Sequence, residues 1–379
     1  MQSSAVLMNS VVHSLRQVAL CLLLAGGFVS VPQATAQGGD ISQLAAPSGS
    51  QAGGTLVFQA LSGGPIYAVN ADGSALRYLT TGMDPSLSPD GQWVAFTRWD
   101  DIQNGATGSL WVISVDGSQE RPILGEIRQP RSPVWSPDGT QLAISKLNGG
   151  RLAPERVCAG QLPKSAYDVD MKRDVEEDGD IEITYCYTMP AHTFWGLRMV
   201  EATSGKFEDL AADLYSHSPA WDPVNTWHLV FEAEWGLMSL DVKRGATWVL
   251  TSDVNDHSPT FSPDGRKIAV TYWQNDHWEI HALNADGTGR VRLTETSARA
   301  ALEQAVNGEK RHSWNNAAPA WSPDGSRIAF LTDRDDRWEI WVMNADGSDQ
   351  HQLLAPEGEA QAQLNLQYNG VDERVLSWR

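Results

Sequence analysis

The chain has 379 residues, of which 41% are hydrophobic and 20% are charged, so its composition is that of a globular protein with a large core. It contains 28 Lys and Arg residues against 47 Asp and Glu residues, a formal net charge of −19. This excess of acidic residues argues against a protein whose main role is to bind nucleic acid or to carry a cationic membrane-binding patch.

The first 36 residues have the features of an export signal. Arg16 is their only charged residue, an apolar run follows over residues 18–31, and Ala34-Thr35-Ala36 suits signal peptidase cleavage. The run is shorter than the roughly 20 residues that a spanning helix needs. We therefore expect a signal peptide over residues 1–36, a mature protein that does not span the membrane, and a periplasmic or secreted location. The alternative is a signal that is retained as an anchor.

Residues 37–54 are rich in Gly, Ser, Ala and Gln, which predicts a flexible linker. After it, one motif occurs five times, beginning at residues 84, 132, 218, 258 and 318: DPSLSPDGQWVAFT, SPVWSPDGTQLAIS, SPAWDPVNTWHLVF, SPTFSPDGRKIAVT and APAWSPDGSRIAFL. The copies predict two strands joined by a turn, and the four that contain Pro-Asp-Gly have the chemistry of a tight turn, because Gly supplies the positive φ that a hairpin demands. Two further strands follow, as in EIHALNADG and EIWVMNADG. Four short strands in about 40 residues are typical of one propeller blade.

The two ends of the repeat region predict how many blades there are. The repeat region begins mid-unit, at residues 55–60, and ends on residues 374–378, which align with the innermost strand. Six inner strands result, centred on Leu87, Trp135, Trp221, Phe261, Trp321 and Trp378. We predict an all-β, six-bladed β-propeller over residues 55–379. Pairing of its N- and C-terminal strands closes the ring and removes free sheet edges.

The run SPDGxxIAF followed by EIxxMNADG resembles the WD40-like Pro-Asp repeat of TolB-type periplasmic β-propellers. The resemblance covers about residues 55–379. It implies a propeller fold and a periplasmic setting, and it is less specific for function. Similar propellers serve as binding scaffolds and as gating domains of prolyl-oligopeptidase-type hydrolases.

Two long insertions are expected on one face of the disc: residues 146–193 within blade 3, and residues 296–316, predicted to be helical, between blades 5 and 6. Loops on a rigid scaffold commonly carry binding residues, so we assign function to this face. The first insertion contains Cys158 and Cys186, which we expect to form a disulfide in an oxidising compartment. The alternative is two buried free thiols.

Residues four positions before the inner-strand centres are predicted to ring the channel mouth on this face. The candidate binding residues among them are Arg131, His217, His257 and Arg374. His217 and His257 fall on neighbouring blades and suggest either a paired-histidine metal site or two hydrogen-bonded rim histidines. Four tryptophans are predicted in loops of the same face, where they would contact a partner or pack structurally: Trp99, Trp235, Trp273 and Trp314.

The blade 3 insertion contains DVEEDGDIE, whose carboxylates suggest a loop that wraps Ca2+. The proposed ligands are Asp174, Glu176, Asp178 and Glu182. Tyr185 occupies the twelfth position, where an EF-hand has a bidentate Glu. The alternative is a solvated acidic hairpin turn.

The chain contains no GxSxG, HExxH or phosphate-binding glycine loop. We therefore expect a monomeric, non-catalytic binding scaffold that holds a protein or cell-envelope partner through the loop-elaborated face and the channel mouth. The alternative is a channel-site enzyme, such as a lyase or hydrolase that acts on an acidic polysaccharide. In that case the four candidate mouth residues would supply acid–base and anion-binding groups.

Overall fold

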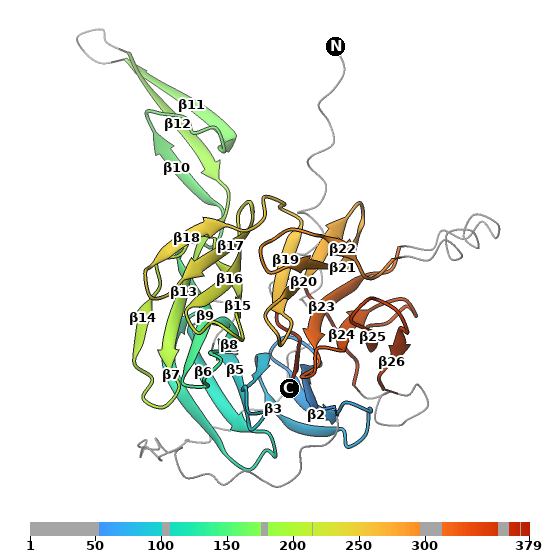
Figure 1. The fold of residues 1–379 in the computed structure, drawn as a ribbon. Coiled ribbons are helices and arrows are strands. Elements are labelled where there is room, and N and C mark those ends of the chain that lie inside the picture. Colours follow the sequence, from blue (N-terminus) through green and yellow to red (C-terminus); the bar gives the residue numbers. More distant parts are fainter. Residues whose placement is uncertain are drawn as a thin grey trace, which may run out of the picture. The chain divides into compact units, whose positions relative to one another are not determined.

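The computed structural model describes residues 53–100, 107–175, 181–213, 215–295, 313–354, 364–371 and 373–379. These residues form six four-stranded antiparallel sheets and one three-stranded sheet (Figure 1). The predicted signal peptide, and the predicted linker up to residue 52, lie outside the described residues, as do residues 296–312 of the predicted helical insertion. Within the described ranges, the structure contains no apolar helix of the length that a membrane-spanning segment requires.

Each four-stranded sheet is one blade, whose strands run in order from the channel to the outer edge. Blade 1 consists of β27 (Leu376–Trp378), β1 (Thr55–Gln59), β2 (Pro65–Asn70) and β3 (Arg77–Thr81). Blade 2 consists of β4 (Met83–Leu87), β5 (Trp93–Trp99), β6 (Thr107–Ser114) and β7 (Glu120–Arg128). Blade 3 consists of β8 (Arg131–Trp135), β9 (Gln141–Arg151), β13 (His192–Glu201) and β14 (Phe207–Asp209).

The remaining blades follow the same order. Blade 4 consists of β15 (His217–Trp221), β16 (His228–Ala233), β17 (Gly236–Asp241) and β18 (Ala246–Val249). Blade 5 consists of β19 (Asp256–Phe261), β20 (Lys267–Gln274), β21 (His277–Asn284) and β22 (Val291–Arg292). Blade 6 consists of β23 (Asn316–Trp321), β24 (Arg327–Thr332), β25 (Glu339–Asn344) and β26 (His351–Gln352).

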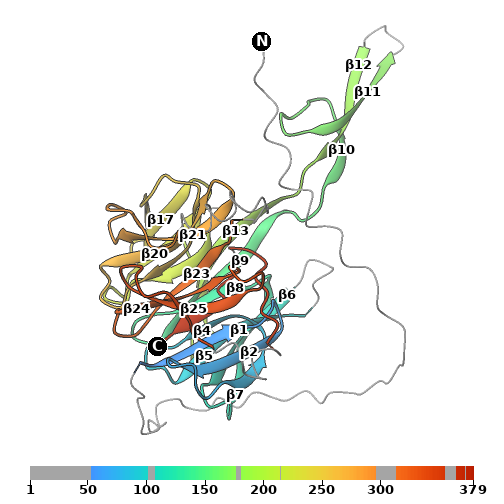
Figure 2. The same cartoon turned by 90° about the vertical axis from the view of Figure 1, so that its right-hand side faces the viewer.

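The ring closes as the sequence predicts. Strand β27 pairs antiparallel with β1, with Trp378 opposite Leu56, so the C-terminus lies against blade 1 (Figure 2). The inner strands of neighbouring blades contact one another from blade 1 to blade 6, and β23 of blade 6 contacts β27. The six-bladed propeller and its terminal closure are therefore confirmed.

Tryptophans of the inner strands join neighbouring blades. The indole Nε1 of Trp135 donates to the carbonyl of Ser86 at 3.0 Å, and that of Trp321 donates to the carbonyl of Thr260 at 3.2 Å. Both rings are buried. These contacts combine apolar burial with a partner for each indole N–H, which is what a buried Trp requires.

The turn that follows an inner strand is fixed by the same hydrogen bonds in several blades. In blade 3, the hydroxyl of Ser136 donates to Asp138 Oδ1 at 2.6 Å and accepts from the backbone N–H of Gln141 at 2.9 Å. Ser322 and Asp324 of blade 6 repeat the first of these bonds. The Ser-Pro-Asp-Gly motif is thus a turn motif, and we call the face that carries it the turn face.

The opposite face, where the inner strands begin, is called the mouth face. Five inner strands have a bulge at this end, centred on a non-glycine residue with positive φ: Asp84 (56°), Ser132 (48°), Ser218 (44°), Ser258 (48°) and Ala318 (53°). A proline follows each of them. At two of the bulges, the backbone N–H of the central residue donates to a side chain of the neighbouring blade. The N–H of Asp84 donates to Gln59 Oε1 at 2.6 Å, and that of Ala318 donates to Thr271 Oγ1 at 3.0 Å. These bonds help to hold a conformation that is uncommon for side-chain-bearing residues.

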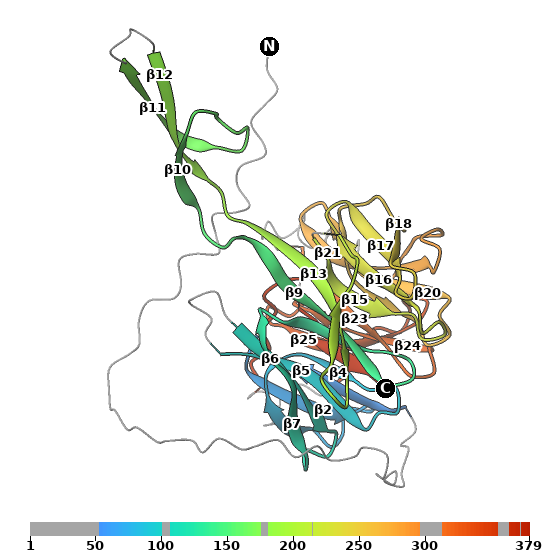
Figure 3. The ribbon, with the colours of Figure 1, turned by 90° about the vertical axis from the view of Figure 1, so that its left-hand side faces the viewer.

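The blade 3 insertion forms its own sheet, which lies between β9 and β13 in the chain (Figure 3). The β9–β13 ladder continues to the pair Arg151 and His192, so residues 146–151 and 192–193 belong to the blade and not to the insertion. The insertion sheet has the order β10 (Glu155–Ala159), β12 (Ile181–Met189) and β11 (Tyr167–Val175). Cys158 and Cys186 face each other on β10 and β12 and form the predicted disulfide.

Candidate functional site

A buried polar cluster lies in the channel just below the mouth face. Asp84 is fully buried, and its carboxylate accepts from the backbone N–H groups of Ser132 and Arg374, both at 2.9 Å. Burial, together with the negative charge of Glu373, raises the pKa of Asp84 to about 7. The cluster therefore ties together the inner segments of blades 1, 2 and 3.

Arg374 departs from its predicted place at the mouth. Its guanidinium is partly buried and donates from Nη2 to the carbonyl of Pro219 at 2.7 Å. Pro219 belongs to blade 4, three blades away from blade 1, so the side chain reaches across the channel. Burial lowers the pKa of Arg374 to about 10, and the charge of Asp84 partly opposes this. The attraction of Asp84 and the bond to Pro219 offset the cost of burying the guanidinium.

Side chains on the mouth face form two rows of contacts from blade 2 to blade 5, joined by the cross-strand pair of His217 and Glu232, and we call the whole set the mouth belt. Its members, in order of contact, are Trp99, Arg131, Trp195, His217, Glu232, His257, Trp278 and Trp273. Three of the four candidate mouth residues and two of the four candidate tryptophans are brought together in this belt.

Arg131 is the centre of the first half of the mouth belt. Its guanidinium carbon lies 4.8 Å from the ring centroid of Trp99 and 5.7 Å from that of Trp195. The Trp195 ring in turn lies 4.8 Å from the ring of His217. This half therefore presents a cation near two indole rings, one of which also contacts an imidazole.

His257 is the centre of the second half. Its Nδ1 lies 2.7 Å from Glu232 Oε1, and its ring centroid lies 5.2 Å from that of Trp278. Trp278 packs edge-on against Trp273 at 4.6 Å. Glu232 faces His217 across the β15–β16 ladder, which joins the two halves.

The other two candidate tryptophans lie outside the mouth belt. Trp235 is 69% exposed, just before strand β17. Trp314 is half-buried, and its indole N–H has no hydrogen-bond partner among the described residues. Among the described residues, neither Trp235 nor Trp314 has a ring contact with a member of the belt.

Sequence reasoning missed four important residues: Asp84, Trp195, Glu232 and Trp278. A signal for Asp84 exists, because it occupies the position before proline where the other repeats have Ser or Ala. Trp195 and Trp278 lie near the beginning of the third strand of their blades, whereas binding tryptophans were expected in loops.

The described residues include only part of the predicted metal sites. Among the described residues, no group of three or more His, Cys, Asp and Glu side chains could hold a metal ion. Asp174 and Glu182 of the predicted Ca2+ loop face each other on β11 and β12. The other two proposed ligands, Glu176 and Asp178, lie outside the described residues.

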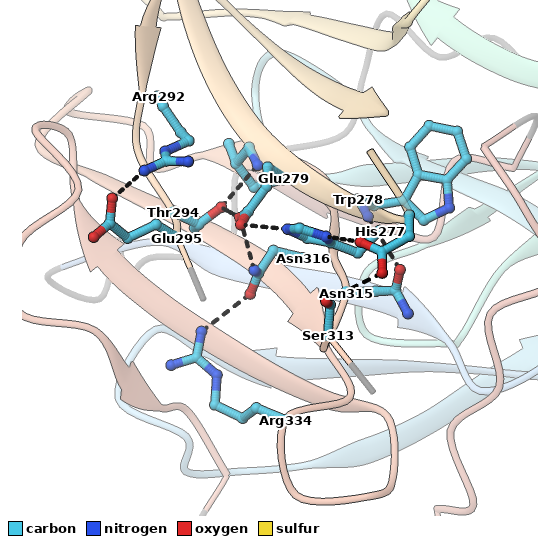
Figure 4. A network of polar contacts seen from close by, with 12 residues as sticks. His277, Trp278, Glu279, Arg292, Thr294, Glu295, Ser313, Asn315, Asn316 and Arg334 are labelled. Atoms are coloured by element: carbon cyan, nitrogen blue, oxygen red, sulfur yellow. Dashed lines mark hydrogen bonds and ion pairs between the residues drawn. The ribbon is translucent and has the colours of Figure 1, made fainter. Parts of the chain in front are cut away.

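A network of polar side chains joins blades 5 and 6 on the mouth face, next to the second half of the belt (Figure 4). Glu279 is fully buried and accepts from the hydroxyl of Thr294 and from Asn316 Nδ2, the latter at 3.0 Å. One ring nitrogen of His277 lies 3.0 Å from the same carboxylate. The side chain of Asn315 accepts from the backbone N–H of Trp278 at 3.1 Å. The network thus fixes the strand that carries Trp278.

This network does not have the arrangement of a Ser-His-Asp catalytic triad. The hydroxyl of Ser313 donates to Asp276 Oδ2 at 3.5 Å, while Asp276 Oδ1 lies 2.8 Å from His277 Nδ1. In a triad the imidazole must touch the hydroxyl that it deprotonates. In this network the carboxylate lies between the two other groups.

The chain has distant relatives in sequence, although no protein-family model matches it. It is 26% identical over 155 residues to uncharacterized peptidase YuxL of Bacillus subtilis (strain 168), a match of 40% of this chain and 21% of the relative. It is 34% identical over 93 residues to Tol-Pal system protein TolB of Anaeromyxobacter dehalogenans (strain 2CP-C), a match of 24% of this chain and 18% of the relative. The chain thus spans about a fifth of the length of these curated relatives.

The structural comparison covers more of the molecule. The crystal structure of TolB from Acinetobacter baumannii matches 86% of this chain and 66% of that chain, with a TM-score of 0.56 and 15% sequence identity. The fold is a TolB-like propeller. At this identity the likeness is one of fold alone.

Proposed function

We propose that the protein is an exported, non-catalytic binding scaffold that holds a protein or cell-envelope partner at the mouth belt and the surrounding face. The observation that carries this proposal is the belt itself, which extends over four blades at the opening of a channel occupied by Arg374. Aromatic and arginine side chains are the residues that contribute most strongly to binding interfaces.

The placement of Arg374 favours binding over catalysis. Acid–base catalysis requires groups that converge on one reacting atom. Arg131 and His257 lie in different halves of the belt, and Arg374 lies inside the channel, bonded to Pro219. An enzyme that used all four candidate mouth residues on an acidic polysaccharide would need a different arrangement of these groups.

The disulfide supports the proposed export. Disulfides form and persist mainly in secreted proteins and in the periplasm, because cytosolic thiols are kept reduced. Cys158 and Cys186 are paired in the insertion sheet, beyond the blade itself. A periplasmic or secreted location is therefore part of the proposal.

The test is capture of a partner from cell-envelope extract by the tagged, purified protein. A variant with Trp99→Ala and Trp273→Ala removes one aromatic ring from each half of the belt and is expected to lose most of the captured partner. Trp235→Ala is the matched control, since Trp235 is exposed on the same face but outside the belt. Equal capture by the double variant and by wild type, with both folded, would refute the proposal.

A further inference from the structure

We propose that Arg131 is the binding site for a carboxylate group of the ligand at the mouth. This inference rests on the proposed function and names the chemistry that the belt recognises. Three arginines, Arg98, Arg131 and Arg334, each have a guanidinium within 6 Å of the centroids of two aromatic rings, and their comparison supports this inference.

For Arg98, the chain itself supplies both the aromatic rings and the hydrogen-bond acceptors. Its guanidinium carbon lies 4.5 Å from the ring centroid of Trp111 and 5.0 Å from that of Phe96. Nη1 forms an ion pair with Glu120 Oε1 at 2.6 Å, and Nη2 donates to Thr80 Oγ1 at 2.7 Å. The two rings lie against the guanidinium, and Glu120 and Thr80 supply its acceptors.

Arg334 repeats the arrangement with neutral acceptors. It lies 4.0 Å from the ring centroid of Trp341 and 5.7 Å from that of Phe330. Its Nη2 donates to Asn316 Oδ1 at 3.1 Å and to Gln350 Oε1 at 3.0 Å. Both of these clamps are therefore satisfied within the protein.

Arg131 has the two rings but lacks the acceptors. No hydrogen bond or ion pair joins its guanidinium to any residue in the described part of the chain, and its buried Nε has no partner there. Asp84 attracts Arg131 electrostatically, but no hydrogen bond joins the two side chains among the described residues, and the Asp84 carboxylate accepts from the backbone N–H groups of Ser132 and Arg374. A buried donor without a partner costs free energy, which a ligand that accepts from it would recover.

The clamp is already in place without a ligand. Trp99 Nε1 donates to the carbonyl of Pro130 at 2.9 Å, and Trp195 Nε1 donates to Thr193 Oγ1 at 3.1 Å. Both rings are therefore fixed, and they restrict the guanidinium that lies near them. Such preorganisation lowers the entropy that is lost on binding.

The surroundings favour a carboxylate over a doubly charged anion. A guanidinium fork matches the two oxygens of a planar carboxylate. The chain carries a net charge of −19, and Glu232 and Asp84 lie on the same face or just below it, so a phosphate dianion would be repelled more strongly than a single negative charge. The carboxylate could come from a peptide or from an acidic sugar.

The experiment uses the purified, 15N-labelled full chain, titrated at constant ionic strength while the Nε–H and indole N–H resonances are followed by NMR. The probes are N-acetylglycine for a peptide carboxylate, glucuronate for an acidic sugar, N-acetylglycinamide as the uncharged analogue, and inorganic phosphate. Saturable shifts with one or both carboxylates are expected, and the probe that binds more tightly indicates the source. Arg131→Gln should weaken this binding about tenfold or more, the loss of a charge-assisted hydrogen bond.

Arg98→Gln is the matched control and should leave the affinity unchanged, because Arg98 is already paired with Glu120 outside the belt. The inference is overturned if neither carboxylate binds saturably, if phosphate binds more tightly, or if Arg131→Gln binds like wild type. The partner-capture experiment tests the proposed function separately. If capture depends on Trp99 and Trp273 but no carboxylate binds, the binding-scaffold proposal is retained and only the role of Arg131 is rejected.

Discussion

The two ends of the inner strands follow different rules. At the turn face, the same serine and aspartate hydrogen bonds return in blade after blade, as at Ser136 with Asp138 and Ser322 with Asp324. At the mouth face, the bulge geometry returns, but the side chain before each bulge changes from Met83 to Arg131 and His217. The residue types repeat where a turn requires particular side-chain atoms. They vary at the mouth face, where the backbone conformation does not require a particular side chain.

The difference extends to the charge states of aspartates. Hydrogen bonds from Ser322 and Ser326 lower the pKa of Asp324 on the turn face to about 2. Burial has the opposite effect on Asp84 beneath the mouth and raises its pKa to about 7. The same residue type thus stabilises a turn as an anion at one end and is easily neutralised at the other.

The largest expected effect comes from breaking the ring that holds both ends together. Trp378 is 2% exposed, and its Nε1 donates to the carbonyl of Gly53 at 2.9 Å. Trp378→Ala should lower the free energy of unfolding by about 3–5 kcal/mol, measured by urea denaturation. The exposed Trp235→Ala is the control, with an expected change within about 0.5 kcal/mol. Similar losses in the two variants would contradict closure through β27.

An intermediate effect is expected from the ionisation of Asp84. Because its folded-state pKa of about 7 lies above the ordinary aspartate pKa of 3.8, its contribution to stability is fully present below pH 3.8 and is lost as the pH rises through 7. The free energy of unfolding should fall between about pH 5 and pH 8, on the order of a few kcal/mol. Asp84→Asn should reduce this slope, measured by urea denaturation at both pH values. An unchanged slope would mean that another group titrates.

The smallest effect is expected at the turn face. Asp324→Ala removes the acceptor of bonds from Ser322 and Ser326 and should cost about 1 kcal/mol at pH 7. Since the folded-state pKa of Asp324 is lowered, its contribution is present above pH 3.8 and is lost as the pH falls toward 2. The difference between variant and wild type, followed by thermal unfolding, should therefore shrink on acidification. A difference that grew instead would contradict the opposite behaviour of the two aspartates.

Much of the fold is predictable because its causes are local. Pro-Asp-Gly and Ala-Asp-Gly steps specify tight turns through their own backbone and side chains, and the aromatic centre of each repeat marks an inner strand. The number of blades follows from counting these motifs, and the pairing of β1 with β27 follows from the incomplete unit at each end. The ends of the blade 3 insertion are less predictable, because the β9–β13 ladder continues until its pairing stops at Arg151 and His192.

The sequence by itself therefore determined the repeat and the six blades, since each repeat unit depends on residues close together in the chain, and the incomplete unit at each end of the repeat region predicted the terminal closure. Only the tertiary structure decided that Trp99 and Trp195 contact Arg131, and that Arg374 turns into the channel toward Pro219. Trp99 and Arg131 come from different blades, as do Arg374 and Pro219, and Trp195 reaches Arg131 from the third strand of the same blade. Their chemistry is set by which side chains the ring brings together and by how much water it leaves around them.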